Sequence, residues 1–233
     1  MLINSAGFHK NNDLPHFKEL NQDLLRRLVG HGKPNREHLL STDNDSIIYL
    51  IEGEIRVEQI IKYPIFIPPY LLKNENKLQF DISLAYSFDP VKDDHLNYLP
   101  LHISFSLVKN LDIKSVGATK NIYGIKNGIG WSEDHFGIDN RLFSNAQKMS
   151  YRLQPNDIVN CDGSVAIAVR CLAKNNFLHA LKQSKHNFSI VVRVSEIITN
   201  TNEPGINLFT EMMKINNYVD ISNNVEAGLD IDL

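Results

Sequence analysis

Residue types that carry catalysis are plentiful in this sequence, but their spacing assembles no familiar site. Asp134 and His135 are adjacent in "WSEDHFGID", and direct neighbours in a chain make a poor catalytic pair. The stretch "STDNDS" over residues 41–46 is rich in the oxygen ligands that calcium prefers. It lacks the spacing of a known calcium loop, and we interpret it as a turn. No nucleophile elbow, zinc-binding helix or glycine-rich phosphate loop is present. We therefore expect no catalytic residue, no metal and no cofactor in this chain.

The two cysteines, Cys161 and Cys171, fit no common zinc or redox spacing. Cys171 alternates in step with Val165, Ile167 and Val169, which indicates a small core residue. A disulfide across a hairpin is the alternative. The N-terminal stretch "MLINSAGFHKNND" lacks the features of a signal peptide. We predict free, structural thiols in a cytoplasmic protein, although an upstream signal stays open if the chain is a fragment.

Composition narrows the class of protein. The chain has 233 residues, of which 42% are hydrophobic and 22% are charged, as in ordinary globular proteins. Its net charge of -3 argues against a nucleic-acid binder, because such a protein needs a basic face to neutralise phosphates. No apolar run approaches the length of a membrane-spanning helix, so no membrane partner is expected.

One amphipathic helix is predicted near the start of the chain, over residues 14–30. Apolar residues recur there at helical spacing, namely Leu14, Phe17, Leu20, Leu24, Leu25 and Leu28. The stretch "GHGKPN" follows. Gly30 and Gly32 tolerate the backbone conformation at a helix C-terminus, and Pro34 cannot continue a helix. We interpret Gly30, Gly32, Pro34 and Asn35 as a structural turn motif.

From residue 45 the hydrophobic pattern changes to period two. In "KLQFDISLAYSFDP", Phe80, Ile82 and Leu84 share one face. Similar stretches predict about eight strands: "SIIYLIEGEI", "EQIIKYPIFIPPYL", "KLQFDISLAYSFDP", "HISFSLV", "RLFSNAQKMSYRLQP", "SVAIAVRCLA", "HNFSIVVRVSEII" and "GINLFTEM". The loop over residues 172–186 is predicted to hold a short helix. We expect a mainly β fold, an antiparallel jelly-roll-like β-sandwich preceded by the N-terminal helix.

The last residues, 218–233, form an acidic segment. They contain Asp220, Glu226, Asp230 and Asp232 and no basic residue. Such a composition is typical of a solvated, flexible tail, and calcium binding or partner docking is the alternative.

The order of several stretches resembles the region that follows the catalytic domain in a bacterial group of subtilisin-like serine proteases, or subtilases. The run "LINSA", the turn "GHGKPN", and then "YPIFIPPYL" and "LQFDISLAYSFDPV" are each similar to a stretch of that region and occur in the same order. The stretches "VAIAVRCLA", "FSIVVRVSEI" and "INLFTEM" look like its last three strands. The resemblance spans nearly the whole chain, and its specificity comes from the order of the pieces.

The catalytic motifs of that family, "GTSxAxP", "HGT" and "DTG", do not occur here. The resemblance therefore implies a non-catalytic C-terminal region that braces a serine endopeptidase domain or positions its protein substrate. Residues 1–40 would join the catalytic domain, 41–217 would form the sandwich, and 218–233 the tail. The implied partner is a subtilisin-like catalytic domain, in cis or in trans, and self-association through the N-terminal segment is also expected.

Two other interpretations of the sequence stay open. The chain is alternatively a free-standing β-sandwich module that binds protein, carbohydrate or calcium, since such sandwiches host many functions. A carbohydrate binder needs exposed aromatic residues, and Trp131, Tyr123 and Tyr70 are the candidates near turns. An enzyme with an unrecognised site is the last alternative.

Overall fold

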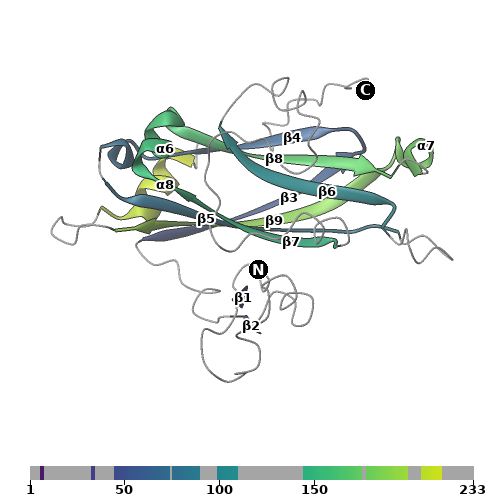
Figure 1. Ribbon diagram of the computed structural model, residues 1–233, viewed down its shortest axis with the longest axis horizontal. Helices are drawn as coiled ribbons and strands as arrows, with labels where there is room; N and C mark the ends of the chain where they lie inside the picture. The colour runs from purple at the N-terminus through teal and green to yellow at the C-terminus, as the bar shows by residue number, and fades with distance from the viewer. Residues whose placement is uncertain are drawn as a thin grey trace, which may run out of the picture.

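The computed structural model of the chain describes residues 6–7, 33–34, 45–73, 75–89, 99–109, 144–174, 177–198 and 206–216. Within these ranges the chain is mainly β, as the sequence predicts, and seven strands form two antiparallel sheets in two layers (Figure 1). A separate antiparallel pair joins β1 (Ala6–Gly7) to β2 (Lys33–Pro34). The N-terminal helix predicted over residues 14–30 lies outside the described residues.

The first layer is a four-stranded sheet with the order β3-β9-β5-β7. Its strands are β3 (Ser46–Arg56), β9 (Lys185–Ile197), β5 (Lys77–Tyr86) and β7 (Ala146–Leu153). Neighbours in this sheet are never consecutive in the chain, so the connections pass between the layers. The register places Leu84 opposite both Ile190 and Gln147. This row of side chains faces the second sheet.

The second layer is a three-stranded sheet with the order β4-β8-β6. Its strands are β4 (Ile60–Phe66), β8 (Ser164–Ala173) and β6 (Leu101–Lys109). Ile167 of β8 stands opposite Tyr63 on one side and Leu107 on the other. The central strand β8 is buried along most of its length.

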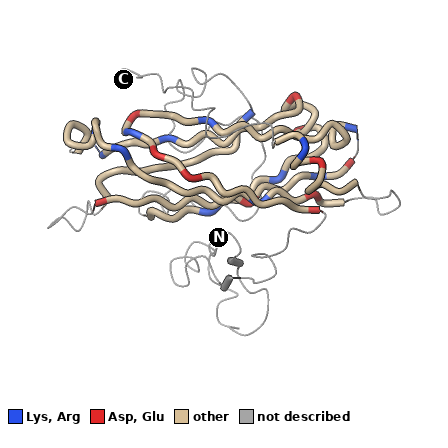
Figure 2. The backbone as a smooth tube through the Cα atoms, turned by 180° about the vertical axis from the view of Figure 1, so that it is seen from behind, with Lys and Arg blue, Asp and Glu red and all other residues tan. Residues whose placement is uncertain are grey.

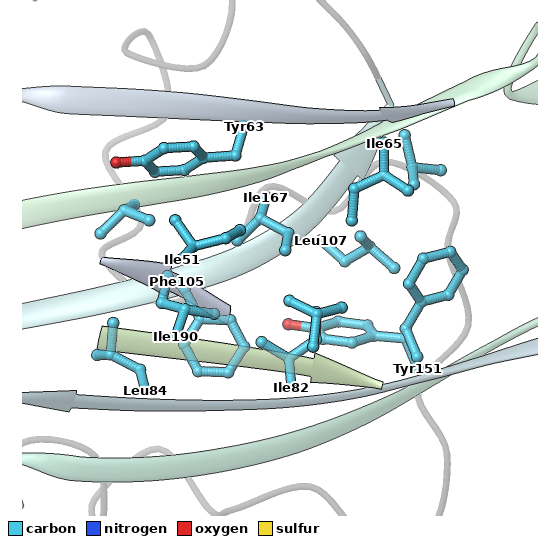
Figure 3. Packing of buried hydrophobic residues seen from close by; sticks show 14 of the residues in the cluster. Ile51, Tyr63, Ile65, Ile82, Leu84, Phe105, Leu107, Tyr151, Ile167 and Ile190 are labelled. Carbon is cyan, nitrogen blue, oxygen red and sulfur yellow. The ribbon is translucent and has the colours of Figure 1, made fainter. Parts of the chain in front are cut away.

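The core fills the space between the sheets with side chains that alternate along the strands (Figure 3). Ile82 and Ile190 come from the four-stranded sheet, whereas Leu107 and Ile167 come from the three-stranded sheet, and all four are buried. This is the face that period-two alternation predicts for residues 78–86. Burial of such residues drives folding, at about 25 cal/mol per Å² of apolar surface.

A glycine in β3 is required by the packing of this core. A Cβ atom on Gly53 would lie 2.8 Å from Tyr63 Oη and 3.0 Å from Phe188 Cζ. The two rings meet edge to face, with their centroids 6.3 Å apart. Because β4 approaches β3 and β9 so closely here, a larger residue does not fit without movement of the rings.

Short helices lie at both ends of the sandwich. The helices α6 (Pro155–Asn160) and α8 (Leu208–Asn216) lie at one end, and α7 (Leu178–Leu181) lies at the other (Figure 1). The 3₁₀ helix η2 (Pro69–Leu72) contacts α6. The short helix predicted within residues 172–186 is confirmed as α7.

The prediction of an eighth strand over residues 205–212 is wrong. Residues 208–216 form the helix α8 instead. Leu208 and Met212 are fully buried and lie one helical turn apart, and Asn216 follows after another turn. The helix contacts β3 and β4, the first strands of the two sheets, and so bridges the sheets at that end of the sandwich.

Candidate functional site

The predicted turn motif is only partly within the described residues. Pro34 lies in β2, where it stands opposite Ala6. Gly30, Gly32 and Asn35 lie outside the described residues. The role of the motif in ending a helix therefore stays a prediction.

Both cysteines are free and buried, as predicted from the alternation of Cys171 with its neighbours. Burial raises the pKa of the Cys171 thiol to about 12, and burial also raises the pKa of Cys161. A thiol of that kind stays protonated near neutral pH, and the thiolate is the nucleophilic form. Cys161 ends helix α6 by donating its backbone N–H to the Asp157 carbonyl at 3.0 Å. Both thiols are therefore structural.

A buried carboxylate joins three segments at the end of the sandwich that carries α6 and α8. Glu196 Oε2 accepts a hydrogen bond from Tyr70 Oη at 2.6 Å, and its Oε1 accepts one from Asn76 Nδ2 at 2.7 Å. Its backbone N–H donates to the Asp45 carbonyl at 2.8 Å. Burial, and then the neighbouring Glu196, raise the pKa of Tyr70, so the phenol stays a donor.

This arrangement is a structural clamp. Both carboxylate oxygens of Glu196 already accept a hydrogen bond, which suits positioning more than proton transfer. Tyr70 is half-buried, and its hydroxyl is committed to Glu196. That position does not offer the free aromatic platform that a carbohydrate binder needs. Trp131 and Tyr123 lie outside the described residues.

A second polar cluster lies on the outward side of the four-stranded sheet. Ser150 Oγ donates to Asp81, and Gln79 Nε2 donates to both oxygens of Asp81 at 3.1 Å. Arg152 Nη2 in turn donates to Gln79 Oε1 at 3.2 Å. Arg193 stands opposite Asp81 in the register of β5 and β9. A serine beside a carboxylate invites comparison with a catalytic triad.

The described histidines do not complete such a triad. Catalysis by serine needs an imidazole between the hydroxyl and the carboxylate. His102 lies in the three-stranded sheet, His179 lies in α7, and His186 stands in the core register opposite Ile55. None of these three lies on the outward side of the four-stranded sheet, so the Asp81 cluster holds strands together.

Asn216, which the sequence analysis missed, takes the place of a neighbouring strand at the edge of β4. Its Oδ1 accepts from the Phe66 N–H at 2.9 Å, and its Nδ2 donates to the Phe66 carbonyl at 3.1 Å and to the Met212 carbonyl at 3.0 Å. The side chain thus satisfies both backbone groups of one edge residue. The signal in the sequence is its helical spacing from Met212 and Leu208.

The outward side of the three-stranded sheet carries a second hydrophobic cluster, which we call the outer cluster. Its members are Ile60, Val108, Ala166 and Ala168. They point away from the core formed between the sheets, yet Val108 and Ala166 are 0% exposed. The run "SVAIAV" in β8 is the signal that indicates burial on both faces. This face is the best candidate for an interaction surface.

No group of three or more His, Cys, Asp and Glu side chains suited to a metal occurs among the described residues. In the same part of the chain, no helix has the length and apolar character needed to cross a membrane.

Comparison with known proteins gives distant likeness to solved structures alone. No protein-family model matches the sequence, and no curated protein matches it. Among solved structures the chain is similar to "The Structure of Tomato Aspermy Virus by X-Ray Crystallography" at 13% identity, with 79% of this chain and 100% of that chain covered. The TM-score is 0.29, and a likeness at this level carries no argument about function.

Proposed function

We propose that the chain is the non-catalytic C-terminal β-sandwich region of a subtilisin-like serine endopeptidase, where it braces the protease domain or positions protein substrate. One observation carries the proposal. Four of the stretches that resemble that region fall on η2 and the strands β4, β5, β8 and β9 of one sandwich with a continuous core, whereas "LINSA" and "GHGKPN" lie mostly outside the described residues. That these four stretches belong to one structural unit supports the proposal. The stretch "INLFTEM" departs from it, because it lies in and before helix α8.

The pairing of strands supports a jelly-roll architecture for this region. A jelly roll pairs its first strand with its last in one sheet, and its second strand with the one before last in the other. Among the seven strands of the described sandwich, β3 pairs with β9, and β4 pairs with β8. A jelly roll hosts many functions, so the architecture is compatible with the proposal and does not select it.

The free thiols support a cytoplasmic location for the chain. Cys161 and Cys171 are both buried and unpaired. Proteins of oxidising compartments tend to use their cysteines in disulfides. The proposed partner is a subtilisin-like catalytic domain, in the same polypeptide or encoded separately.

The DNA preceding the Met1 codon provides the first test. We expect it to encode, in frame or as a neighbouring gene, a domain with a serine in a "GTS" motif. Expressed together, the two parts should hydrolyse casein and react with a fluorophosphonate probe on that serine alone. The protease domain expressed without residues 1–233 should lose activity faster on warming. Labelling of a serine within residues 1–233, abolished by one Ser→Ala substitution, would instead establish this chain as an enzyme.

A further inference from the structure

The outer cluster is a group of hydrophobic residues on the side of the three-stranded sheet that faces away from the core. Ile60 stands opposite Arg170, and Val108 stands opposite Ala166 in the register. Their neighbours Ile61 and Ile167 face the core, so these positions face outward. Ile60 is nevertheless 3% exposed and Val108 is 0% exposed. Polar residues on the same side of the sheet, such as Lys62, Arg170 and Ser104, flank the cluster, yet its apolar members are withdrawn from water.

The charged residues within the three strands of this sheet are all basic. The strands β4, β8 and β6 contain no Asp or Glu (Figure 2). Lys62 and Arg170 alternate in step with the outer cluster and therefore lie on its side of the sheet. A segment that covers this face should be apolar and acidic together.

The C-terminal segment has both properties and begins beside this sheet. Helix α8 ends at Asn216, whose side chain is bonded to Phe66 on the edge strand β4. Residues 217–233 carry four acidic residues and no basic residue, and the branched aliphatic residues among them are Val219, Ile221, Val225, Leu229, Ile231 and Leu233. Extended, this segment spans more than ~50 Å, whereas three strands are ~10 Å across. The distance is therefore easily covered.

We propose that residues 217–233 pack on the outer cluster, with their apolar side chains on Ile60 and Val108 and their carboxylates near Lys62 and Arg170. The outward side of the three-stranded sheet is then an interaction surface whose partner is a segment of the same chain. The competing outcome is the solvated tail that composition alone favours. The inference does not depend on the proposed link to a protease, because it concerns only this chain.

Hydrogen exchange on the full chain, followed by mass spectrometry, tests the proposal directly. Backbone amides of residues 217–233 should exchange at least about tenfold more slowly than in an unstructured peptide of the same sequence. The double variant Lys62→Glu with Arg170→Glu should remove most of that protection by repelling the carboxylates. The matched control is Lys148→Glu with Arg152→Glu, which makes the same charge change in the four-stranded sheet and should leave the tail protected.

Truncation after Asn216 supplies the second measurement. The shortened chain should bind more of a hydrophobic dye and melt about 5 °C lower, because the outer cluster becomes exposed to water. Tail amides that exchange at the unstructured rate in the unmodified chain would overturn the proposal. A truncated chain with unchanged melting temperature and dye binding would also overturn it, since the segment would then cover nothing.

Discussion

The two outer faces of the sandwich satisfy their outward side chains in different ways. On the four-stranded sheet, Asp81, Ser150 and Gln79 bind one another through hydrogen bonds, and Leu50 is 60% exposed. On the three-stranded sheet, Val108 and Ala166 are 0% exposed and form part of a second hydrophobic cluster. The first face carries polar side chains that bind one another, whereas the second carries a hydrophobic cluster beside the basic residues Lys62 and Arg170. Ser150 and Val191 on the first face are also withdrawn from water, so the two faces differ in what they bury, which is partly polar on the first and a hydrophobic cluster on the second.

The largest expected effect comes from placing a charge on each face in turn. Val108→Asp should lower the free energy of unfolding by about 3–5 kcal/mol, because it buries an unpaired carboxylate. Leu50→Asp should lower it by less than about 1 kcal/mol, because this side chain already meets water. Urea unfolding of both variants measures the contrast. Equal losses would show that the two faces do not differ.

The stability of the chain at alkaline pH should depend on Cys171, which is buried in the core between the two sheets. Its pKa is raised from 9.0 to about 12 in the folded chain, so its contribution to stability is complete below pH 9 and is lost as the pH rises toward 12. Each pKa unit corresponds to about 1.4 kcal/mol. Between pH 8 and pH 11 the unmodified chain should lose about 2–3 kcal/mol more than Cys171→Ala.

Urea unfolding at each pH gives the measurement. Cys161→Ala serves as the control, and should change the pH dependence less. Parallel curves for the unmodified chain and Cys171→Ala would contradict the burial of the thiol.

Loss of the hydrogen bonds between Asn216 and Phe66, at the edge of the three-stranded sheet, should have an intermediate effect. Asn216→Ala leaves the Phe66 N–H and carbonyl without their partner and should cost about 2 kcal/mol. Thr210→Ala, on the exposed side of the same helix, should cost less than about 0.5 kcal/mol. Thermal unfolding of the two variants tests this. A loss for Asn216→Ala no greater than for Thr210→Ala would mean that the hydrogen bonds of Asn216 do not hold α8 in place.

The smallest effect is expected on the outward side of the four-stranded sheet. Lys185 Nζ and Glu54 Oε2 are 2.7 Å apart, but both side chains are more than half exposed. Such a pair is screened by water, and Glu54→Gln should change the free energy of unfolding by less than about 0.5 kcal/mol. The same urea unfolding experiment applies, at low and at high salt. A loss above 1 kcal/mol would assign this face a larger electrostatic role than its exposure allows.

Seven of the eight predicted strands agree with the structure, and their success has a simple cause. Period-two alternation in stretches such as residues 77–86 matches a strand that faces a core on one side. The eighth prediction failed at residues 205–212, because a short apolar stretch also fits a helix when Leu208 and Met212 share one face. Periodicity over so few residues does not separate the two.

The residues of the candidate site were harder to predict from the sequence than the strands were. The sequence analysis singled out Gly30, Gly32, Pro34 and Asn35 as a turn, and only Pro34 lies in the described residues. It did not single out Asn216 or Glu196, whose partners lie more than a hundred residues away in the chain. Contacts over such separations depend on how the strands are ordered, which local patterns do not encode.

By itself, the sequence determined the class of fold, the free state of Cys161 and Cys171, and the absence of the subtilase catalytic motifs from this chain. These follow from local alternation and from residue types, which need no knowledge of distant neighbours. Only the tertiary structure decided that α8 is a helix and that Asn216 seals the edge of β4. It also decided that the two outer faces differ. Strand order brings Ile60, Val108 and Ala166 together from three separate parts of the chain, and only that meeting creates a hydrophobic cluster whose exposure to water would cost free energy.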